Sequence, residues 1–416
     1  MKFAIAAVAL TFNLLTAAVG ANAATTAWVQ MVTGGAEARA VTDAPHCPRI
    51  AVDGRSRRMK ERVSPSEAFP NRVCEAPLPA GARRVSVDAI TLPVPVARPR
   101  RLVILGDSGC RLKGAVVQHC NDPSGWPFAR VAALAAARKP DLVVHVGDYY
   151  YRETPCPAGN AACAGSPYGD RWATWKAEVF DPAAPLLAAA PWVFTRGNHE
   201  DCKRGGPGWF RLLDAAPAPK ACPAQSDTFA VDVAGARLFV VDSNDTEDFT
   251  APTALTTAFA TRLGSVRGGP DRPAWIVTHR PIWNAVRLGP LLADGVVNRT
   301  ERAAVKGRDL AGVQLILSGH VHNFTSLNFG AGRPAQLVVG TGGDLMAAND
   351  TPPPAVGAVA VDGLPAQAFT MGRFGYFVFD RKGADWVGAF HDLTDAVAAT
   401  CRLHGRSLIC RTTPSD

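Results

Sequence analysis

The stretch RLVILGDSG at residues 101–109 joins a short apolar run to a polar turn, and this pattern recurs four more times. The later copies are LVVHVGDYYY at 142–151, WVFTRGNHE at 192–200, WIVTH at 275–279 and VQLILSGHVH at 313–322. Continuous apolar runs of this length are typical of strands buried on both faces. Helical patterns at 128–138 and 170–190 alternate with them. The alternation predicts an α/β fold with polar residues gathered at the carboxyl ends of its strands.

The polar residues at these five strand ends are Asp, Asn and His, the types that surround a pair of metal ions. Two ions roughly 3.5–4 Å apart can bind the oxygens of a phosphate ester and lower the pKa of a bound water to about 7. A single Gly-Asp or Gly-His-x-His is more often an ordinary turn. Five in order, each after an apolar strand, favour a metal-dependent hydrolase.

The ordered motifs GDSG at 106–109, GDYYY at 147–151, GNHE at 197–200, TH at 278–279 and GHVH at 319–322 resemble the five motif blocks of calcineurin-like phosphoesterases. The resemblance spans residues 101–322. It implies a four-layer αββα sandwich, here preceded by a small β-rich N-terminal region. The implied activity is hydrolysis of phosphomonoesters by attack of a metal-bound hydroxide.

One position points to the purple acid phosphatases within that superfamily. Most members carry a histidine ligand two residues after the first aspartate, where this chain has Gly109. In purple acid phosphatases a tyrosine three residues after the bridging aspartate takes its place, and counting from Asp148 gives Tyr151. The resemblance assigns the first metal to Asp107, Asp148, Tyr151 and His322, and the second to Asp148, Asn198, His279 and His320. A phenolate favours Fe(III) at the first site, with Fe, Zn or Mn at the second.

By the same resemblance His199 faces the substrate, as a proton donor to the leaving alkoxide or as a phosphate ligand. Its alternative role is that of a loop histidine that orients Asn198. Arg152, Arg196 and Arg280 each flank a metal ligand and are candidate phosphate clamps. Each is equally consistent with a surface ion pair.

The chain begins like an exported protein. Residues 1–23 have a charged start, an apolar Ala-rich core and a small-x-small end, which predicts a signal peptide cleaved after Ala23. No later stretch is long and apolar enough to span a bilayer. The ten cysteines fall into couples close in sequence, which predicts disulfides in a periplasmic or secreted protein. The couples are Cys47/Cys74, Cys110/Cys120, Cys156/Cys163, Cys202/Cys222 and Cys401/Cys410.

We expect a β-rich region with a Pro-rich connector at 24–98, the phosphoesterase domain at 99–395 and a disulfide-closed hairpin at 396–416. The formal net charge of +8 is carried without a long basic run, so we expect a small phosphate ester as partner and no nucleic acid. One alternative is a phosphodiesterase acting on nucleotides or phospholipid head groups. Another is a non-catalytic exported binding protein on the same scaffold, against which the intact ligand set argues.

Overall fold

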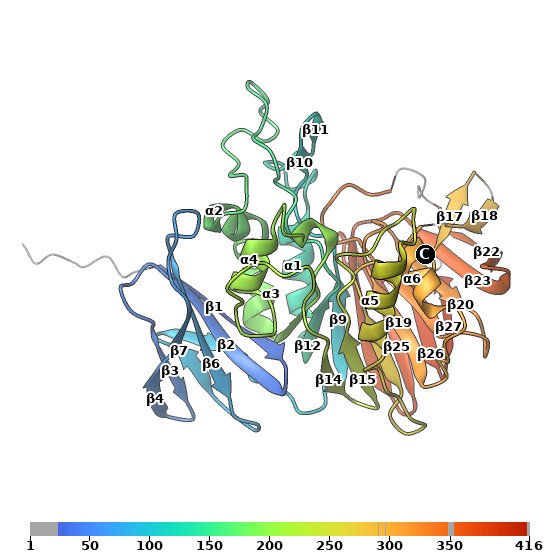
Figure 1. Ribbon diagram of the computed structural model, residues 1–416, viewed down its shortest axis with the longest axis horizontal. Helices are drawn as coiled ribbons and strands as arrows, with labels where there is room; N and C mark the ends of the chain where they lie inside the picture. Colours follow the sequence, from blue (N-terminus) through green and yellow to red (C-terminus); the bar gives the residue numbers. More distant parts are fainter. Residues whose placement is uncertain (1–23, 290, 296, 348–352, 414–416) are drawn as a thin grey trace, which may run out of the picture.

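The computed structural model describes residues 24–289, 291–295, 297–347 and 353–413. In this part of the chain two large sheets lie face to face, with helices on their outer faces (Figure 1). The first sheet has eleven strands. In spatial order they are β27 (Ser407–Thr412), β26 (Val397–His404), β25 (Asp385–Asp392), β24 (Gly375–Lys382), β9 (Arg101–Leu105), β12 (Leu142–His145), β13 (Trp192–Phe194), β1 (Thr25–Val32), β2 (Gly35–Thr42), β6 (Arg72–Leu78) and β5 (Lys60–Val63).

The second sheet has eight strands, and its centre is parallel. In order they are β14 (Phe229–Val233), β15 (Ala236–Val240), β16 (Ala274–Val277), β19 (Val313–Ser318), β21 (Ala335–Val339), β20 (Phe324–Asn328), β23 (Leu364–Met371) and β22 (Ala355–Val361). Three small sheets complete the strands: β4 (Arg55–Arg58), β3 (Arg49–Val52), β7 (Val85–Val87) and β8 (Ile90–Leu92); β10 (Leu112–Lys113) with β11 (Val116–Val117); and β17 (Ala285–Leu288) with β18 (Leu291–Asp294).

The helices are short and form the two outer layers (Figure 1). They are α1 (Phe128–Ala137), α2 (Trp172–Trp175), α3 (Ala184–Ala189), α4 (Gly206–Leu212), α5 (Thr253–Leu263) and α6 (Arg299–Val305), with a π-helical turn at Lys176–Phe180 and a 3-10 turn at Asn198–Glu200. Helix α1 buries residues at i, i+3, i+4 and i+7 from Phe128, which is the apolar stripe of a helix lying on a sheet.

Three apolar clusters separate the layers. Alternate residues of the central strands point into the space between the sheets, where Trp275 of β16 meets Trp386 of β25 with ring centres 5.1 Å apart. The opposite faces pack against α1, α3 and α4 on the first sheet and against α5 and α6 on the second. This arrangement confirms the four-layer αββα sandwich.

The N-terminal region is β-rich, as expected, but half of it continues the main sheet. Strand β1 pairs in parallel with β13, at Gln30 and Trp192, and brings β2, β6 and β5 with it. The C-terminal hairpin of β26 and β27 likewise extends the opposite edge of the same sheet. Both segments pair with the edges of the central strands, which removes unpaired sheet edges there. They also bury apolar residues in the same clusters as those strands.

The ten cysteines form five disulfides, and these are the pairings that sequence proximity predicted. The bonds are Cys47–Cys74, Cys110–Cys120, Cys156–Cys163, Cys202–Cys222 and Cys401–Cys410. Within the described ranges, no helix has the length and apolar character needed to cross a membrane. The predicted signal peptide lies outside the described residues.

Candidate metal centre

Four of the predicted metal ligands have a left-handed backbone. Asp107, Asp148, His320 and His322 have φ angles of 55°, 60°, 71° and 44°, which non-glycine residues seldom adopt. Each lies just past the carboxyl end of β9, β12 or β19. The turns hold one another, since the amide of Asp107 donates to Gly147 O at 2.9 Å and that of Ser108 to Asp148 O at 3.0 Å. The strained turns aim these side chains at one point.

The side chains meet in two groups that share one carboxylate. Asp107, Asp148 and His322 offer three ligand atoms within 4.8 Å of one another, and so do Asp148, His279 and His320. Asp107 and Asp148 are almost completely buried. A buried carboxylate between two clusters of donors is the arrangement that a pair of metal ions requires.

Tyr151 completes the first group. Its hydroxyl lies 3.3 Å from Asp107 Oδ1, 3.0 Å from Asp148 Oδ2 and 3.1 Å from His322 Nε2. A Cβ atom at Gly109 would lie 2.6 Å from the ring of Tyr151 and 2.5 Å from Tyr149 O. A histidine at position 109 and a tyrosine at 151 would therefore compete for the same space, so the two ligand types exclude each other.

Asn198 lies with the second group. Its Oδ1 is 3.2 Å from His279 Nε2, which is itself 3.1 Å from Asp148 Oδ2. On the other side of the ring, His279 Nδ1 donates to Val146 O at 2.8 Å, and His322 Nδ1 donates to Leu345 O at 2.7 Å. A histidine that gives its proton to a carbonyl presents a free lone pair at the other nitrogen, as metal-binding histidines do.

The charges of the groups also fit bound cations. Burial alone would raise the pKa of Asp148, but His279 and His199 outweigh it and pull this pKa well below its usual value. Burial and the carboxylates Asp148 and Asp107 raise the pKa of Tyr151 well above its usual value. Only a cation beside the hydroxyl would reverse that effect and release the phenolate. Buried carboxylates, imidazoles and a phenol in two groups that share one aspartate fit a dinuclear metal site.

His199 lies over the tyrosine ligand. Its ring centre is 4.0 Å from that of Tyr151, and its amide donates to Asp148 Oδ1 at 3.0 Å. On the side chain, Nδ1 is 3.0 Å from Glu153 Oε1 and Nε2 is 4.0 Å from Asp148 Oδ2. The imidazole is thus beside the metal ligands, and its amide contact also fixes the carboxylate of Asp148.

The three candidate arginines are engaged with protein groups. Arg196 is 1% exposed and donates to Glu200 O at 2.9 Å and to Asp242 at 3.4 Å, so a phosphate has no access to it and it is no surface ion pair either. Arg152 is also buried, 3.8 Å from Glu178. Arg280 binds Asp248 at 2.8 Å. The three arginines thus contact buried carboxylates and carbonyls of the protein. Such buried acceptors need a donor, and the arginines supply it.

Four residues near the ligands escaped prediction. Asp248 Oδ1 lies 3.1 Å from His320 Nε2, and Asp344 Oδ2 lies 3.4 Å from His322 Nδ1. Arg111 binds both oxygens of Asp344 and lies 4.8 Å above the ring of Tyr151. Glu153 is the partner of His199. Only Asp344 had a sequence signal, the glycine-rich turn that follows β21; the others lie in irregular loops.

Comparison with known proteins agrees with this geometry. The family model of the calcineurin-like phosphoesterases matches residues 101–324. Purple acid phosphatase PPD1 from yellow lupin (Lupinus luteus) seeds superposes with a TM-score of 0.57 at 12% identity, over 94% of this chain and 74% of that one. The structure of PhoD gives 0.53 at 13% identity, over 94% and 92%. No curated protein matches the sequence. The likeness to the solved structures shows the shared fold, and the match over residues 101–324 shows that this chain belongs to the calcineurin-like phosphoesterase family.

Proposed function

We propose that this protein is an exported di-metal phosphoesterase that hydrolyses phosphomonoesters. The observation that carries the proposal is the pair of donor groups that share Asp148. The donors that would hold the first ion are Asp107, Asp148, Tyr151 and His322, and those for the second are Asp148, Asn198, His279 and His320. When bound, two such ions supply Lewis acidity to a phosphate oxygen and make water a nucleophile near neutral pH.

Tyr151 favours iron at the first position. A phenolate is a hard anionic ligand that suits Fe(III), whereas the nitrogen and oxygen donors of the second group suit Fe, Zn or Mn. The space that Gly109 leaves for the tyrosine ring supports this assignment.

His199 is proposed as the proton donor to the departing alkoxide, or as a donor to the phosphate. A carboxylate at Nδ1 keeps a proton on that nitrogen and orients the ring. Glu153 is placed for this task, 3.0 Å from His199 Nδ1. The remaining nitrogen is then directed to the site, where it can hold or transfer a proton.

The five disulfides support a periplasmic or secreted location, since such bonds persist in oxidising compartments. Residues 1–23 are proposed as the signal peptide that directs this export.

Replacement of the shared carboxylate tests the proposal. Asp148→Asn should lower phosphomonoesterase activity at least a hundredfold and reduce the metal content by one ion or more, because both groups lose a charged ligand. Asp181→Asn, a surface aspartate paired with Lys176, is the matched control. The measurements are turnover of nitrophenyl phosphate and bis-nitrophenyl phosphate, with metal analysis of each sample. Near-native turnover of Asp148→Asn would exclude the shared ligand.

The same assay separates the alternatives. Faster turnover of the diester than of the monoester would identify a phosphodiesterase. Stoichiometric metal without turnover of either compound would identify a binding protein.

A further inference from the structure

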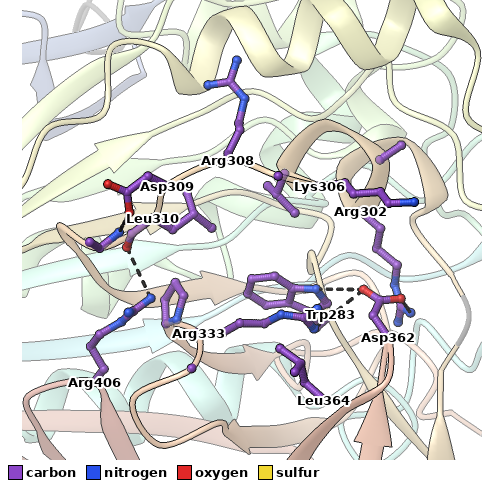
Figure 2. A pocket seen from close by; sticks show the side chains of 16 residues that line it. Trp283, Arg302, Lys306, Arg308, Asp309, Leu310, Arg333, Asp362, Leu364 and Arg406 are labelled. Atoms are coloured by element: carbon purple, nitrogen blue, oxygen red, sulfur yellow. Dashed lines mark hydrogen bonds and ion pairs between the residues drawn. The ribbon is translucent and has the colours of Figure 1, made fainter.

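A pocket of about 670 Å³ is lined by residues at the carboxyl end of α6, from Arg302 to Lys306, and by residues of separate loops. Figure 2 shows the side chains that line it. Its walls include the loop before β19, residues 306–311, and the turn before β21, residues 332–334. It therefore lies at the amino ends of these strands, whereas His320 follows the carboxyl end of β19. Its volume falls within the range of small-molecule sites, roughly 300–1,000 Å³.

Positive charge dominates the lining of this cationic pocket. Two carboxylates line it, and both already have partners. Asp362 accepts from Trp283 Nε1 at 3.2 Å and from Arg302 at 3.0 Å, and Asp309 accepts from the amide of Ala311 at 2.8 Å (Figure 2). The cationic residues of the lining are Arg302, Lys306, Arg308, Arg333 and Arg406. The lining therefore has five cations and two carboxylates. Two of the cations have carboxylate partners, because Arg302 also pairs with Asp294 at 2.7 Å and Arg333 lies 3.8 Å from Asp362.

Several of these cations lack a dedicated counter-charge. Among the residues that the structure describes, the Arg406 side chain donates to the carbonyls of Ala331 and Leu310, both at 3.3 Å, and its buried Nε has no acceptor. Their backbone amides donate to helix carbonyls, but the side chains of Lys306 and Arg308 have no hydrogen-bond or ion-pair partner within the described ranges. Burial lowers the pKa of Arg406, and the nearby carboxylate of Asp309 offsets only part of that effect.

Arg333 is held in place before any ligand binds. Its guanidinium lies 4.8 Å from the ring centre of Trp283 and 5.5 Å from that of Phe329, and it donates to Val361 O at 3.1 Å. Figure 2 shows the guanidinium along the indole of Trp283. A cation fixed in this way loses little conformational freedom when an anion arrives.

The carboxyl end of α6 offers a rival explanation, because a helix attracts cations there. It accounts for Lys306 and Arg308, which follow the helix directly. It does not account for Arg333 or Arg406, which come from the turn before β21 and from the β26–β27 turn. All four side chains line the same pocket although they come from three separate segments. The helix end therefore does not explain why these cations lie together.

We propose that the cationic pocket binds a phosphoryl group, as free phosphate or as part of a small organic molecule. Arginine forks match the oxygens of phosphate in geometry and charge. Apolar side chains complete the lining, among them Leu310 and the partly exposed Leu364, and they give room for an organic substituent. The site is separate from the metal centre and does not depend on the proposed reaction there.

Calorimetric titration of the full-length chain carrying Asp148→Asn, in the presence of a chelator, isolates the pocket from the metal centre. The probes are inorganic phosphate and phenylphosphonate, whose carbon–phosphorus bond is not an ester. We expect saturable binding that Lys306→Gln with Arg406→Gln weakens at least tenfold, since two charge-assisted contacts are lost. Tighter binding of phenylphosphonate would indicate an organic phosphate, and tighter binding of inorganic phosphate the free anion.

The matched control is Arg84→Gln with Lys139→Gln, which also removes one arginine and one lysine charge, but from exposed positions outside the pocket. This control should bind the probes as tightly as the parent does. The exposed Lys306→Gln alone serves if the double variant fails to fold. In the otherwise native chain the pocket variants should keep their phosphoesterase activity, so failure of the pocket and failure of the proposed reaction are distinguishable. Absence of saturable binding, or equal affinity in the pocket variant and the control, would overturn the site.

Discussion

At the residue scale, the choice of ligand at the first metal position depends on one missing side chain. Gly109 leaves the space that the ring of Tyr151 fills, and a Cβ there would overlap it at 2.6 Å. Of the three consecutive tyrosines, only Tyr151 has its hydroxyl among the predicted ligands. The hydroxyl of Tyr149 instead contacts Thr195 O at 3.2 Å.

These contacts predict a colour. A tyrosinate bound to Fe(III) absorbs visible light, so the oxidised, iron-loaded protein should be violet to pink. Tyr151→Phe should abolish the absorption band and weaken iron binding, as followed by visible spectroscopy and iron analysis. Tyr149→Phe and Tyr150→Phe are the controls and should keep the band. If the active protein is colourless and contains no iron, the assignment of an Fe(III)–tyrosinate site like that of the purple acid phosphatases is wrong.

A second prediction concerns His199. A proton donor matters most when the leaving group is poor, and its loss costs roughly 10²–10⁴ in rate. His199→Ala should therefore slow alkyl phosphates far more than nitrophenyl phosphate, with metal content unchanged. Steady-state turnover of both substrates measures this difference, with the exposed His46→Ala as control. Equal losses on the two substrates, or a lost metal, would give His199 the role of orienting Asn198.

At the scale of elements, the N-terminal hairpin of β1 and β2 supports a strand of the metal centre. Strand β1 pairs with β13, which leads into the 3-10 turn that begins at Asn198. The adjacent β2 is fastened by Arg39, whose guanidinium is fully buried and donates to Leu212 O at 2.7 Å and Asp214 O at 2.6 Å. The hairpin and the end of α4 thus form one hydrogen-bonded unit.

Removing this link should destabilise the protein. Arg39→Met keeps the apolar stem but leaves Leu212 O without its side-chain donor, whereas Asp214 O keeps Arg62 as a donor at 3.2 Å. An unsatisfied buried acceptor costs about 1–3 kcal/mol, and Glu37 also loses its ion pair. The free energy of unfolding, from urea titrations, should fall by roughly 2 kcal/mol, whereas the exposed Arg84→Met should change it little. If Arg39→Met unfolds with the same urea midpoint as the wild type, the contacts of Arg39 do not contribute to the stability of the folded protein.

At the scale of the whole molecule, folding stability is linked to pH through buried acids. Burial raises the pKa of Glu301, in α6, to about 7 from an ordinary value of 4.5. Its Oε1 accepts from Thr246, and within the described part of the chain its Oε2 has no hydrogen-bond partner. The folded chain therefore holds this proton more tightly than the unfolded chain does, and stability falls as pH rises from about 4.5 through about 7.

Glu301→Gln should remove this dependence. The amide keeps the oxygen that accepts from Thr246 and carries no charge at any pH. The free energy of unfolding, from urea titrations, should equal that of the wild type near pH 4 and exceed it by roughly 3 kcal/mol at pH 8. The exposed Glu67→Gln should show no such gain. A constant difference between Glu301→Gln and wild type at both pH values would exclude titration of this residue.

The sequence by itself predicted an α/β fold with polar residues gathered at the carboxyl ends of its strands, and its resemblance to the calcineurin-like phosphoesterases implied the four-layer sandwich. Buried parallel strands are recognisable as apolar runs, and their carboxyl ends share an edge, so Asp107, Asp148, Asn198, His279 and His320 could be expected together. Cysteines close along the chain have few partners within reach, so their pairing could be expected as well.

Only the tertiary structure decided what surrounds that centre. Asp248 and Glu153 lie in loops without periodic pattern, and they reach His320 and His199 through packing between distant segments. The pairing of β1 with β13 joins residues about 160 positions apart, which no local pattern encodes. The cationic pocket likewise draws its arginines from separate loops. Local propensity and periodicity act over a few residues, whereas the packing of the sheets and loops sets these contacts.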